Sequence, residues 1–516
     1  MANQQLFRTL RGSLPPVTAR NEAGAPAYAF SPKHRLAQYA ATGCLSGTYC
    51  ASAEVQLDTL LALCREVDAR FVAQTAVYCR EQGYMKDTPA LLAAVLATRG
   101  QDYLPVMFER IVRNGKMLRN FVQIVRSGAV GRKSLGSRPK RLIQGWLNRA
   151  GERELLQAAV GTRPTLADVV KMIHPKPAEP WREAFFAWLM GKPHDESALP
   201  PITRAFEAWK RDRSGPLPDV PFQMLTALEL DATQWASVAR QGGWQMVRMN
   251  VNTFARHGAF EVPGTIKAVA AKLRDRKAIA RAGVFPYQLL AACQAVADSV
   301  PLQVRRALEE ALQISLANVP KLARRVVVCP DVSGSMQSPV TGRRGSATTA
   351  VRCIDVAALV AAALLRKNPE TRVLPFENDV VAVDLDPTAP VLANARKLAA
   401  IGGGGTNCSA PLARLNRERF KADLVVFVSD NESWVDASRR GATATLQEWE
   451  ALRRRNPGAR LACVDIQPYG TSQAPERPGI LNIGGFSDAV FPMLAAFAAG
   501  KLNADHWVGV IEQIEL

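Results

Sequence analysis

Apolar residues recur at helical spacing from about residue 28 to residue 320. Segments 53–68, 69–82 and 88–99 follow in close order, each 12–16 residues long and separated by turn or capping residues. The same spacing continues at 117–128, 138–150, 165–174, 265–276 and 287–300. Alternation of apolar and polar residues is almost absent here. The pattern predicts many short helices stacked as helical hairpins, in the manner of a HEAT-type solenoid, although no fixed repeat length is found.

The pattern changes at about residue 322, where short β-branched runs alternate with helical segments. Strands are predicted within 324–336, 371–378, 380–386, 423–430 and 460–468, and helices over 354–367, 442–455 and 488–500. Strands that alternate with helices are typical of a mostly parallel, doubly wound sheet, whose ligands bind at the carboxyl ends of the strands. A chain of 516 residues is long enough for two such domains.

Positive charge is concentrated in the helical part of the chain. Residues 1–320 hold 42 Lys and Arg against 26 Asp and Glu, a balance of +16, whereas residues 321–516 hold 23 against 20. Residues 101–150 alone hold 11 basic and 2 acidic residues. A basic field of this kind attracts phosphate backbones or anionic membranes.

Neither membrane insertion nor a disulfide framework is expected. The longest aliphatic run, residues 356–365, is too short to span a bilayer and is predicted to be a buried helix. The first 16 residues lack the apolar core of a signal peptide. Nine Cys form no CxxC pair, and the five His are scattered. We therefore expect a cytoplasmic protein with reduced thiols and no zinc site.

Hydroxyl and carboxylate residues recur at the ends of the predicted strands. The candidate ligands are Asp331, Ser333 and Ser335 in a DVSGSM loop, Thr406 after four glycines, and Asp430 at the end of a later strand. Five oxygen ligands on three loops, completed by water, suit the octahedral preference of Mg²⁺. Alternatively, Asp331 and the two serines only cap the loop and the helix that follows. Capping would not require Thr406 and Asp430 as well.

This order of motifs resembles a von Willebrand factor A domain with its metal-ion-dependent adhesion site. The resemblance implies direct coordination by Ser333, Ser335 and Thr406. It implies that Asp331 and Asp430 act mainly through water. In domains of this class the site usually binds a carboxylate of a partner or simply holds the loops.

Basic residues also share helix faces between residues 116 and 141. The candidate phosphate-binding residues of this region are Lys116, Arg119, Arg132, Lys133, Arg138, Lys140 and Arg141. Two cationic faces on adjoining helices make a surface suited to phosphates, and Arg can bind a phosphate through two N–H groups. The alternative is a solvated face whose Arg stems cover apolar surface. The lack of neutralising acids favours binding. Trp146, among Leu and Ile, is predicted to be core and not a platform for a base.

Segment 165–177 is a further candidate. Thr165 and Asp168 form a T-x-x-D helix start, and the helix is expected to stop before a proline, directly after His174. His174 is therefore expected at an exposed helix C-terminus, beside Lys176. On residue type alone such a His is more often structural, because the helix dipole favours it.

Together, these features resemble the TROVE-domain proteins, the Ro autoantigen family and its bacterial members (Rsr). The resemblance is carried by residues 34–54, 131–146 and 171–177 and by the metal-site motifs. The spelling of residues 131–144 is most similar to the bacterial members. The resemblance implies a ring of HEAT-like helical hairpins, the TROVE domain over 25–320, closed by an A domain over 322–516.

Members of this family bind small non-coding Y RNAs on a basic outer surface. They also take single-stranded 3′ ends of misfolded or processed RNAs through a central hole. In bacteria, Y RNA can tether the ring to a 3′ exonuclease, polynucleotide phosphorylase. The His of the family's H-x-K-P stretch contacts Y RNA, which implies this role for His174, with Lys176 beside it. The resemblance does not identify the residues that line the hole.

Three functions follow from these observations. The first is a non-catalytic RNA-binding protein of ribonucleoprotein particles that acts in RNA quality control, because no catalytic set of side chains stands out. The second is a metal-dependent protein-interaction module with a helical scaffold, which would bind an acidic protein and show little salt-sensitive RNA binding. The third, a Mg²⁺ nuclease, is least favoured because the site lacks the paired carboxylates of two-metal chemistry.

Overall fold

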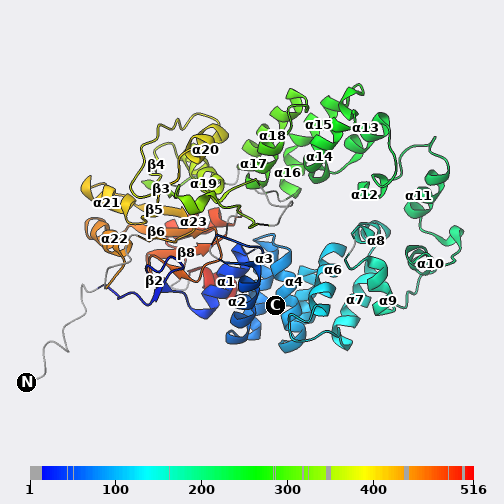
Figure 1. Ribbon diagram of the computed structural model, residues 1–516, viewed down its shortest axis with the longest axis horizontal. Helices are drawn as coiled ribbons and strands as arrows, with labels where there is room; N and C mark the ends of the chain where they lie inside the picture. The colour runs from blue at the N-terminus through cyan, green and yellow to red at the C-terminus, as the bar shows by residue number, and fades with distance from the viewer. Residues whose placement is uncertain are drawn as a thin grey trace, which may run out of the picture. The chain divides into compact units, whose positions relative to one another are not determined.

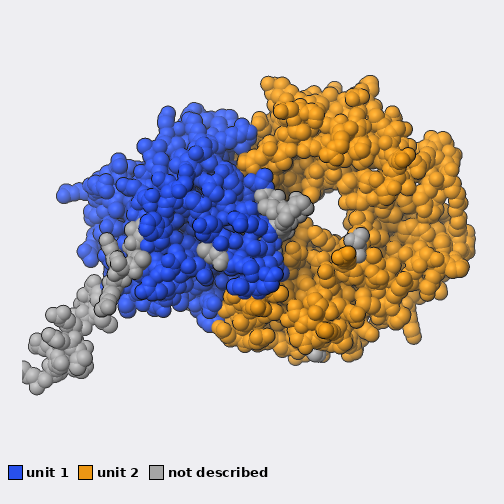
Figure 2. Space-filling view, viewed as in Figure 1, with its two compact units in different colours: residues 1–56, 319–510 blue, residues 57–318, 511–516 orange. Residues whose placement is uncertain are grey.

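The computed structural model describes most of the chain between residue 14 and residue 516. The described ranges are 14–43, 45–49, 51–100, 102–161, 163–282, 284, 286–316, 319–322, 325–343, 350–434, 441–485, 487, 489–502 and 506–516. The chain forms two compact units, coloured separately in Figure 2. We call residues 57–318 and 511–516 the helical unit, and residues 1–56 and 319–510 the sheet unit.

Helices of the helical unit follow one another in chain order (Figure 1). They are α2 (Ala53–Glu66), which begins in the sheet unit, α3 (Ala69–Glu81), α4 (Asp87–Arg99), α5 (Leu104–Ile111), α6 (Gly115–Arg126), α7 (Ser137–Arg149), α8 (Glu152–Ala159), α9 (Leu166–Ile173), α10 (Pro180–Leu189), α11 (Pro201–Arg211), α12 (Phe222–Leu225), α13 (Ala232–Gln241), α14 (Trp244–Arg256), α15 (Thr265–Leu273), α16 (Arg276–Ala282), α17 (Pro286–Ala295) and α18 (Leu302–Ser315). Many of them pack against near neighbours in the chain: α4 contacts α3 and α6, and α6 contacts α8 and α9.

Side-chain caps fix several of these helix starts. Asp68 accepts a hydrogen bond from Phe71 N at 2.8 Å at the start of α3. The expected capping box of α9 is present, since Asp168 N donates to Thr165 Oγ1 at 3.0 Å and Thr165 N donates to Asp168 Oδ2 at 2.9 Å. Such caps satisfy first-turn amides that have no partner within the helix. The predicted series of short helices is confirmed.

The sheet unit is built on a five-stranded parallel sheet in the order β4-β3-β5-β6-β8. Its strands are β3 (Val326–Pro330), β4 (Arg372–Val373), β5 (Leu424–Ser429), β6 (Arg460–Asp465) and β8 (Ile480–Gly484). Its helices are α1 (Pro32–Thr42), α19 (Cys353–Lys367), α20 (Val391–Ala399), α21 (Ala410–Arg417), α22 (Ala444–Arg455), α23 (Val490–Ala498) and α24 (His506–Glu512), the last of which ends in the helical unit.

Helices cover both faces of this sheet. On one face, apolar side chains of β3, β5 and β6 form a core with residues of α21 and α22, centred on the fully buried Trp449. Helix α19 contacts β3, β4 and β5 and packs against α20. Residues 356–365 lie within α19 and are buried except for Val360, as the apolar run predicted. The expected fold class, a helical solenoid followed by a doubly wound domain, is confirmed; closure into a ring stays a prediction.

The strand prediction was wrong in two places. Residues 381–386 form no strand, and only a single bridge joins Val380 to Phe376. β8, which the sequence did not indicate, pairs with β6 at the edge of the sheet. Its sequence, ILNIG, is short and contains Asn and Gly, two residue types that are depleted in strands.

The N-terminal segment lies with the sheet unit and not with the helices that follow it. β1 (Ala19–Arg20), β2 (Pro26–Ala29) and β7 (Thr471–Ser472) form a small antiparallel sheet, and α1 contacts β8. The compact units therefore differ from the expected domains, 25–320 and 322–516, at both ends: residues 25–56 lie in the sheet unit, and residues 511–516 lie in the helical unit. Among the described residues, no helix combines the length and apolar composition that crossing a bilayer requires.

Candidate metal centre and nucleic-acid interface

The loop after β3 brings three of the predicted metal ligands together. Ser333 N donates a hydrogen bond to Asp331 Oδ1 at 2.9 Å, and Ser333 Oγ lies 3.4 Å from Ser335 Oγ. Asp331 and Ser333 are fully buried. This loop therefore holds its oxygens inside the protein, at the carboxyl end of a central strand.

The glycine-rich loop, which contains residues 402–405, lies directly against the loop after β3. Gly334 N donates to Gly404 O at 2.9 Å. Gly402 has a φ of +141°, and a Cβ on it would lie 2.8 Å from Val332 O. A side chain at position 402 is therefore disfavoured both by the backbone conformation and by the close approach of the two loops.

The third loop follows β5 and contacts the glycine-rich loop at Thr406. Thr406 O accepts hydrogen bonds from Ser433 Oγ and Trp434 N, both at 3.3 Å. Thr406 and Asp430 are buried, and Ser335 donates a hydrogen bond to the Asp430 carboxylate. The structure thus brings all five predicted ligands to one edge of the sheet.

The electrostatics of this edge favour a cation. The pKa of Asp331 is raised to about 7, first by burial and then by the negative charge of Asp430. Burial also raises the pKa of Asp430, against the hydrogen bond from Ser335. Among the described residues, no Lys, Arg or His neutralises this pair. A hard divalent cation would stabilise both carboxylates, and the hydroxyls nearby are ligands that Mg²⁺ accepts, so the residues present fit the ion.

Sequence reasoning missed the residues that support these ligands. Ser429 Oγ donates to Asp331 Oδ2 at 2.5 Å, and Glu377 Oε2 accepts from Gly404 N at 2.8 Å. Asp465, at the end of β6, is also buried at this edge, and burial followed by the charge of Asp430 raises its pKa. A position at the carboxyl end of a strand was the only available signal for Ser429 and Asp465.

Some of the predicted phosphate-binding side chains are exposed, and others form hydrogen bonds or ion pairs within the protein. Lys116 on α6, Lys133 in the following loop, and Lys140 and Arg141 on α7 are exposed. Trp146, on the apolar side of α7, is 8% exposed and belongs to the core, as predicted.

One hydrogen bond brings the loop after α9 to the cationic face of α7. Gln144 Nε2 donates to Ile173 O at 3.0 Å, directly before His174. Lys140 and Arg141 precede Gln144 by four and three residues, so they share its helix face. His174 and Lys176 are exposed, and His174 ends α9 in a left-handed conformation, with φ of 51°. This hydrogen bond therefore places the end of α9, directly before His174, beside the helix face that carries Lys140 and Arg141.

Arg119 lies differently from the expectation. It is 8% exposed, and its guanidinium donates hydrogen bonds to Val160 O and Pro164 O. Although Lys116, one turn earlier on α6, is exposed, the Arg119 side chain points into the protein and holds the backbone at Val160 and Pro164. It is not available as the predicted phosphate contact.

Two further predicted phosphate contacts, Arg132 and Arg138, interact with other groups of the protein. Arg132 donates to Ser134 O at 2.7 Å and to Ala97 O at 2.9 Å. Arg138 pairs with the exposed Asp102 at 3.2 Å, an interaction that is weak in water. We define the basic surface as Lys133, Lys140, Arg141, His174 and Lys176.

Known proteins are similar in sequence to this chain, both within the sheet unit and along almost the whole chain. The family model for the Ro60 vWA domain matches residues 325–498. RNA-binding protein RO60 of Deinococcus radiodurans is 26% identical over 525 aligned positions, which cover 94% of this chain and 96% of that protein. The chain is similar to this Ro protein along almost its whole length.

Two more comparisons agree with this similarity. RNA-binding protein RO60 of Caenorhabditis elegans is 23% identical to this chain over 250 residues, 45% of this chain and 37% of that protein. The crystal structure of the Deinococcus radiodurans RO (RSR) protein aligns with a TM-score of 0.60 at 20% identity, over 92% of this chain and 100% of that one. That likeness shows the shared fold. These similarities agree with the resemblance to the Ro family that the sequence indicates.

Proposed function

We propose that this protein is a member of the Ro family, that it binds RNA through the basic surface, and that it does so without catalysis. The observation that carries the proposal is the Gln144–Ile173 contact, which joins the cationic face of α7 to the loop that carries His174 and Lys176. Two relatives, which align with 94% and 45% of this chain, are named RNA-binding protein RO60. Exposed Lys and Arg without nearby acids are suited to phosphates of a structured RNA, recognised by shape and backbone.

The expected ligands are those of the family resemblance. A small Y-like non-coding RNA would occupy the basic surface, and single-stranded 3′ ends of misfolded or precursor RNAs would enter a central hole of the ring. A 3′ exonuclease such as polynucleotide phosphorylase would act on the bound RNA, and the protein would serve in RNA quality control in the cytoplasm.

The metal centre would have a structural or docking role in this function. Ser333, Ser335 and Thr406 would hold Mg²⁺ directly, and Asp331 and Asp430 would act through water. When bound, the ion would supply a positive charge that either binds a carboxylate of a partner or holds the three loops together. The side chains of this chain would orient it: Ser429 fixes Asp331, and Glu377 holds the glycine-rich loop.

The second candidate function is a metal-dependent protein-interaction module without specific RNA binding. It is favoured by Trp434, which is 49% exposed beside the metal centre and lies against Gly405. Trp is enriched among the residues that dominate the binding energy of protein–protein interfaces.

A titration distinguishes the two functions. Purified protein is titrated with a structured RNA that ends in a single-stranded 3′ tail, and with the same RNA ending in a blunt duplex. A variant with Lys133, Lys140, Arg141 and Lys176 replaced by Ala is compared with an Arg417→Ala/Lys421→Ala control, whose residues are exposed in the sheet unit. Tight, tail-dependent binding that only the first variant weakens supports the proposal. Weak binding that is indifferent to tail and variant contradicts it and favours the interaction module.

A further inference from the structure

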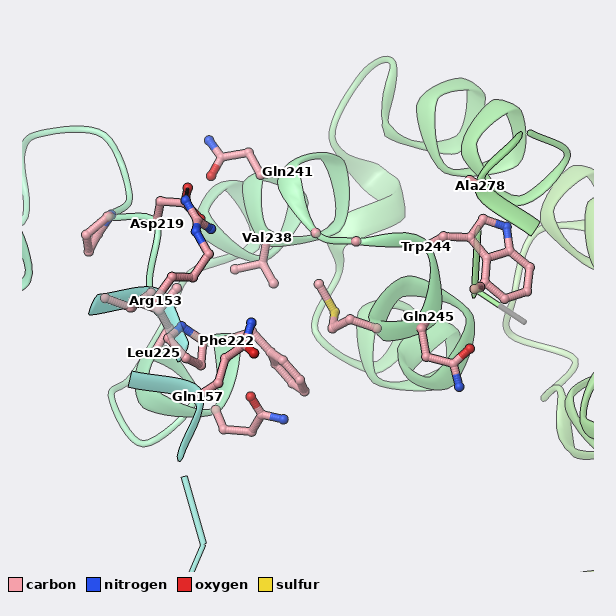
Figure 3. Close-up of a pocket in the computed structure, with 18 of the residues that line it drawn as sticks. Arg153, Gln157, Asp219, Phe222, Leu225, Val238, Gln241, Trp244, Gln245 and Ala278 are labelled. Carbon is pink, nitrogen blue, oxygen red and sulfur yellow. Dashed lines mark hydrogen bonds and ion pairs between the residues drawn. The ribbon is translucent and has the colours of Figure 1, made fainter. Parts of the chain in front are cut away.

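A groove in the helical unit and a tight turn near the N-terminus are not used by the proposed function. The groove has a volume of about 870 Å³, and Figure 3 shows Arg153 at its edge beside Asp219, with which it pairs. The turn, residues 21–25, belongs to the sheet unit and contacts the loop that carries Asp430. The turn is therefore the feature that has a direct connection to the metal centre.

Asn21 closes this turn with one end of its side-chain amide. Asn21 Oδ1 accepts a hydrogen bond from Ala25 N at 2.8 Å, and Gly24 N donates to Asn21 O at 2.9 Å. Gly24 has a φ of +78°, a conformation that glycine adopts without strain. Asn21 itself is 7% exposed. The turn therefore fixes the position of the Asn21 amide inside the protein.

The other end of this amide binds the loop after β5. We call residues 430–434 the Asp430 loop. Asn21 Nδ2 donates to Ser433 O at 2.6 Å, across 412 positions of the chain. Ala23 N donates to Glu432 Oε2 at 3.3 Å, and both Glu432 and Ser433 are buried. The N-terminal turn thus holds two successive residues of the Asp430 loop.

The backbone of the Asp430 loop depends on support from outside. Asn431 has a φ of +62°, in the left-handed region that residues with a side chain adopt infrequently. Its side chain is held from the 471–473 segment, since Asn431 Nδ2 donates to Thr471 O and Gln473 N donates to Asn431 Oδ1, both at 3.3 Å. This segment contains β7, which pairs with β2, the strand that directly follows the turn. The N-terminal segment therefore supports the loop directly through the turn and indirectly through β2.

Hydrogen bonds extend this support to a predicted metal ligand. Ser433 Oγ and Trp434 N both donate to Thr406 O, each at 3.3 Å. Mg²⁺ demands near-ideal octahedral geometry, so its ligands bind well only when their positions are held. A shift of Ser433 would therefore displace Thr406 on one side and Asp430 on the other.

We propose that Asn21 is a positioning residue of the metal centre, which acts through Ser433 to hold Thr406 and Asp430 where Mg²⁺ binds. Asn suits this role because its amide has an acceptor for Ala25 N at one end and a donor for Ser433 O at the other. Asp lacks the donor, and Ser is too short to reach both partners. This inference rests on the metal centre of the proposed function and adds to it a residue from the opposite end of the chain.

The test measures the dissociation constant for Mg²⁺ by isothermal titration calorimetry with the full chain. Asn21→Ser keeps an oxygen that can close the turn and removes the donor to Ser433 O. Arg20→Ala is the matched control, because Arg20 is exposed and its guanidinium donates to Gly24 O within the same turn. Circular dichroism establishes that each variant is folded.

We expect Asn21→Ser to raise the dissociation constant about tenfold, the lower end of the range for residues that support a metal ligand, and Arg20→Ala to leave it unchanged. Ser433→Ala, which removes the bond to Thr406 O, should have a similar effect. The double variant should bind Mg²⁺ little more weakly than either single variant, because both residues act in one chain of contacts. An unchanged constant for Asn21→Ser, or effects of the two substitutions that multiply, overturns the proposal.

Hydrogen exchange without Mg²⁺ is a second readout, independent of the ion. The Trp434 amide, which is bonded to Thr406 O, should exchange faster in Asn21→Ser than in Arg20→Ala or the unsubstituted protein. Equal protection in all three proteins contradicts the proposed support of the Asp430 loop.

The same measurements separate this inference from the proposed function. If the unsubstituted protein does not bind Mg²⁺, the metal centre is misassigned and the proposal fails with it. If it binds Mg²⁺ and Asn21→Ser binds it equally well, only the role of Asn21 is wrong. RNA titration in parallel should give the same affinity for every variant, since none of the substitutions lies on the basic surface.

Discussion

Replacing Arg119 by Met should destabilise the helical unit and leave RNA binding unchanged. Arg119 is almost fully buried on α6, and its guanidinium bridges Val160 O and Pro164 O. Gly161 allows this approach, because a Cβ on it would clash with the guanidinium. Met keeps the apolar stem of the side chain and removes both donors.

The magnitude follows from the two carbonyl groups. Each hydrogen bond from a charged donor contributes about 1.5–3 kcal/mol, and a buried carbonyl left without a donor costs about 1–3 kcal/mol. Burial lowers the pKa of Arg119, so the cost of holding its charge in the protein offsets part of the gain. We expect a net loss of about 2–3 kcal/mol, a large share of the usual 5–15 kcal/mol of folding stability.

Urea unfolding and RNA titration measure the two effects separately. Lys116→Met, three residues away and exposed, is the matched control and should leave the urea midpoint unchanged. A lower midpoint for Arg119→Met with unchanged affinity for the folded protein supports the assignment. An unchanged midpoint together with weaker RNA binding would refute it and restore Arg119 as a phosphate contact.

Three further predictions concern the sheet unit. His34 is buried against Phe30, and burial is the main cause that lowers its pKa to about 3. The free energy of unfolding should therefore fall as the pH drops below about 6.5, by up to about 1.4 kcal/mol per pH unit. Urea midpoints measured at two pH values should show this decrease, and His34→Phe should remove it. Gly402→Ala should lower thermal stability by about 1–3 kcal/mol, because position 402 has a positive φ and lies close to Val332 O, whereas Ala at the exposed Gly458 should have little effect. Asp430→Asn should abolish any increase in melting temperature that Mg²⁺ produces while leaving RNA affinity intact; an undiminished Mg²⁺ response would show that the ion binds elsewhere.

The metal ligands could be predicted because their signal is local and ordered. Each of the three loops follows a recognisable strand or a glycine run, and parallel strands bring their carboxyl ends to one edge. Ser429 could not be predicted as a ligand support, since its contact with Asp331 spans 98 positions in the chain. The position of a residue in a strand predicts at which edge of the sheet it lies, but it does not predict which group its hydroxyl contacts.

Helix periodicity predicted which side chains share a face but not what that face contacts. Lys116 and Arg119 lie on one turn of α6, yet only Arg119 reaches the 160–164 loop and is buried. The same limit applies to β2, whose partner β7 lies more than 400 residues away. Pairings over such separations depend on the packed fold and leave no trace in local spacing.

The salt dependence of RNA affinity tests the central claim most directly. The slope of log affinity against log salt is measured for a structured RNA with the unsubstituted protein, with Lys140→Ala/Lys176→Ala, and with the Arg417→Ala/Lys421→Ala control. Each lost phosphate contact should make the slope shallower by a little under about one unit, so the first variant should change it by about 1.5–2 units and the control should not change it. Equal slopes for all three proteins would contradict RNA binding through the basic surface.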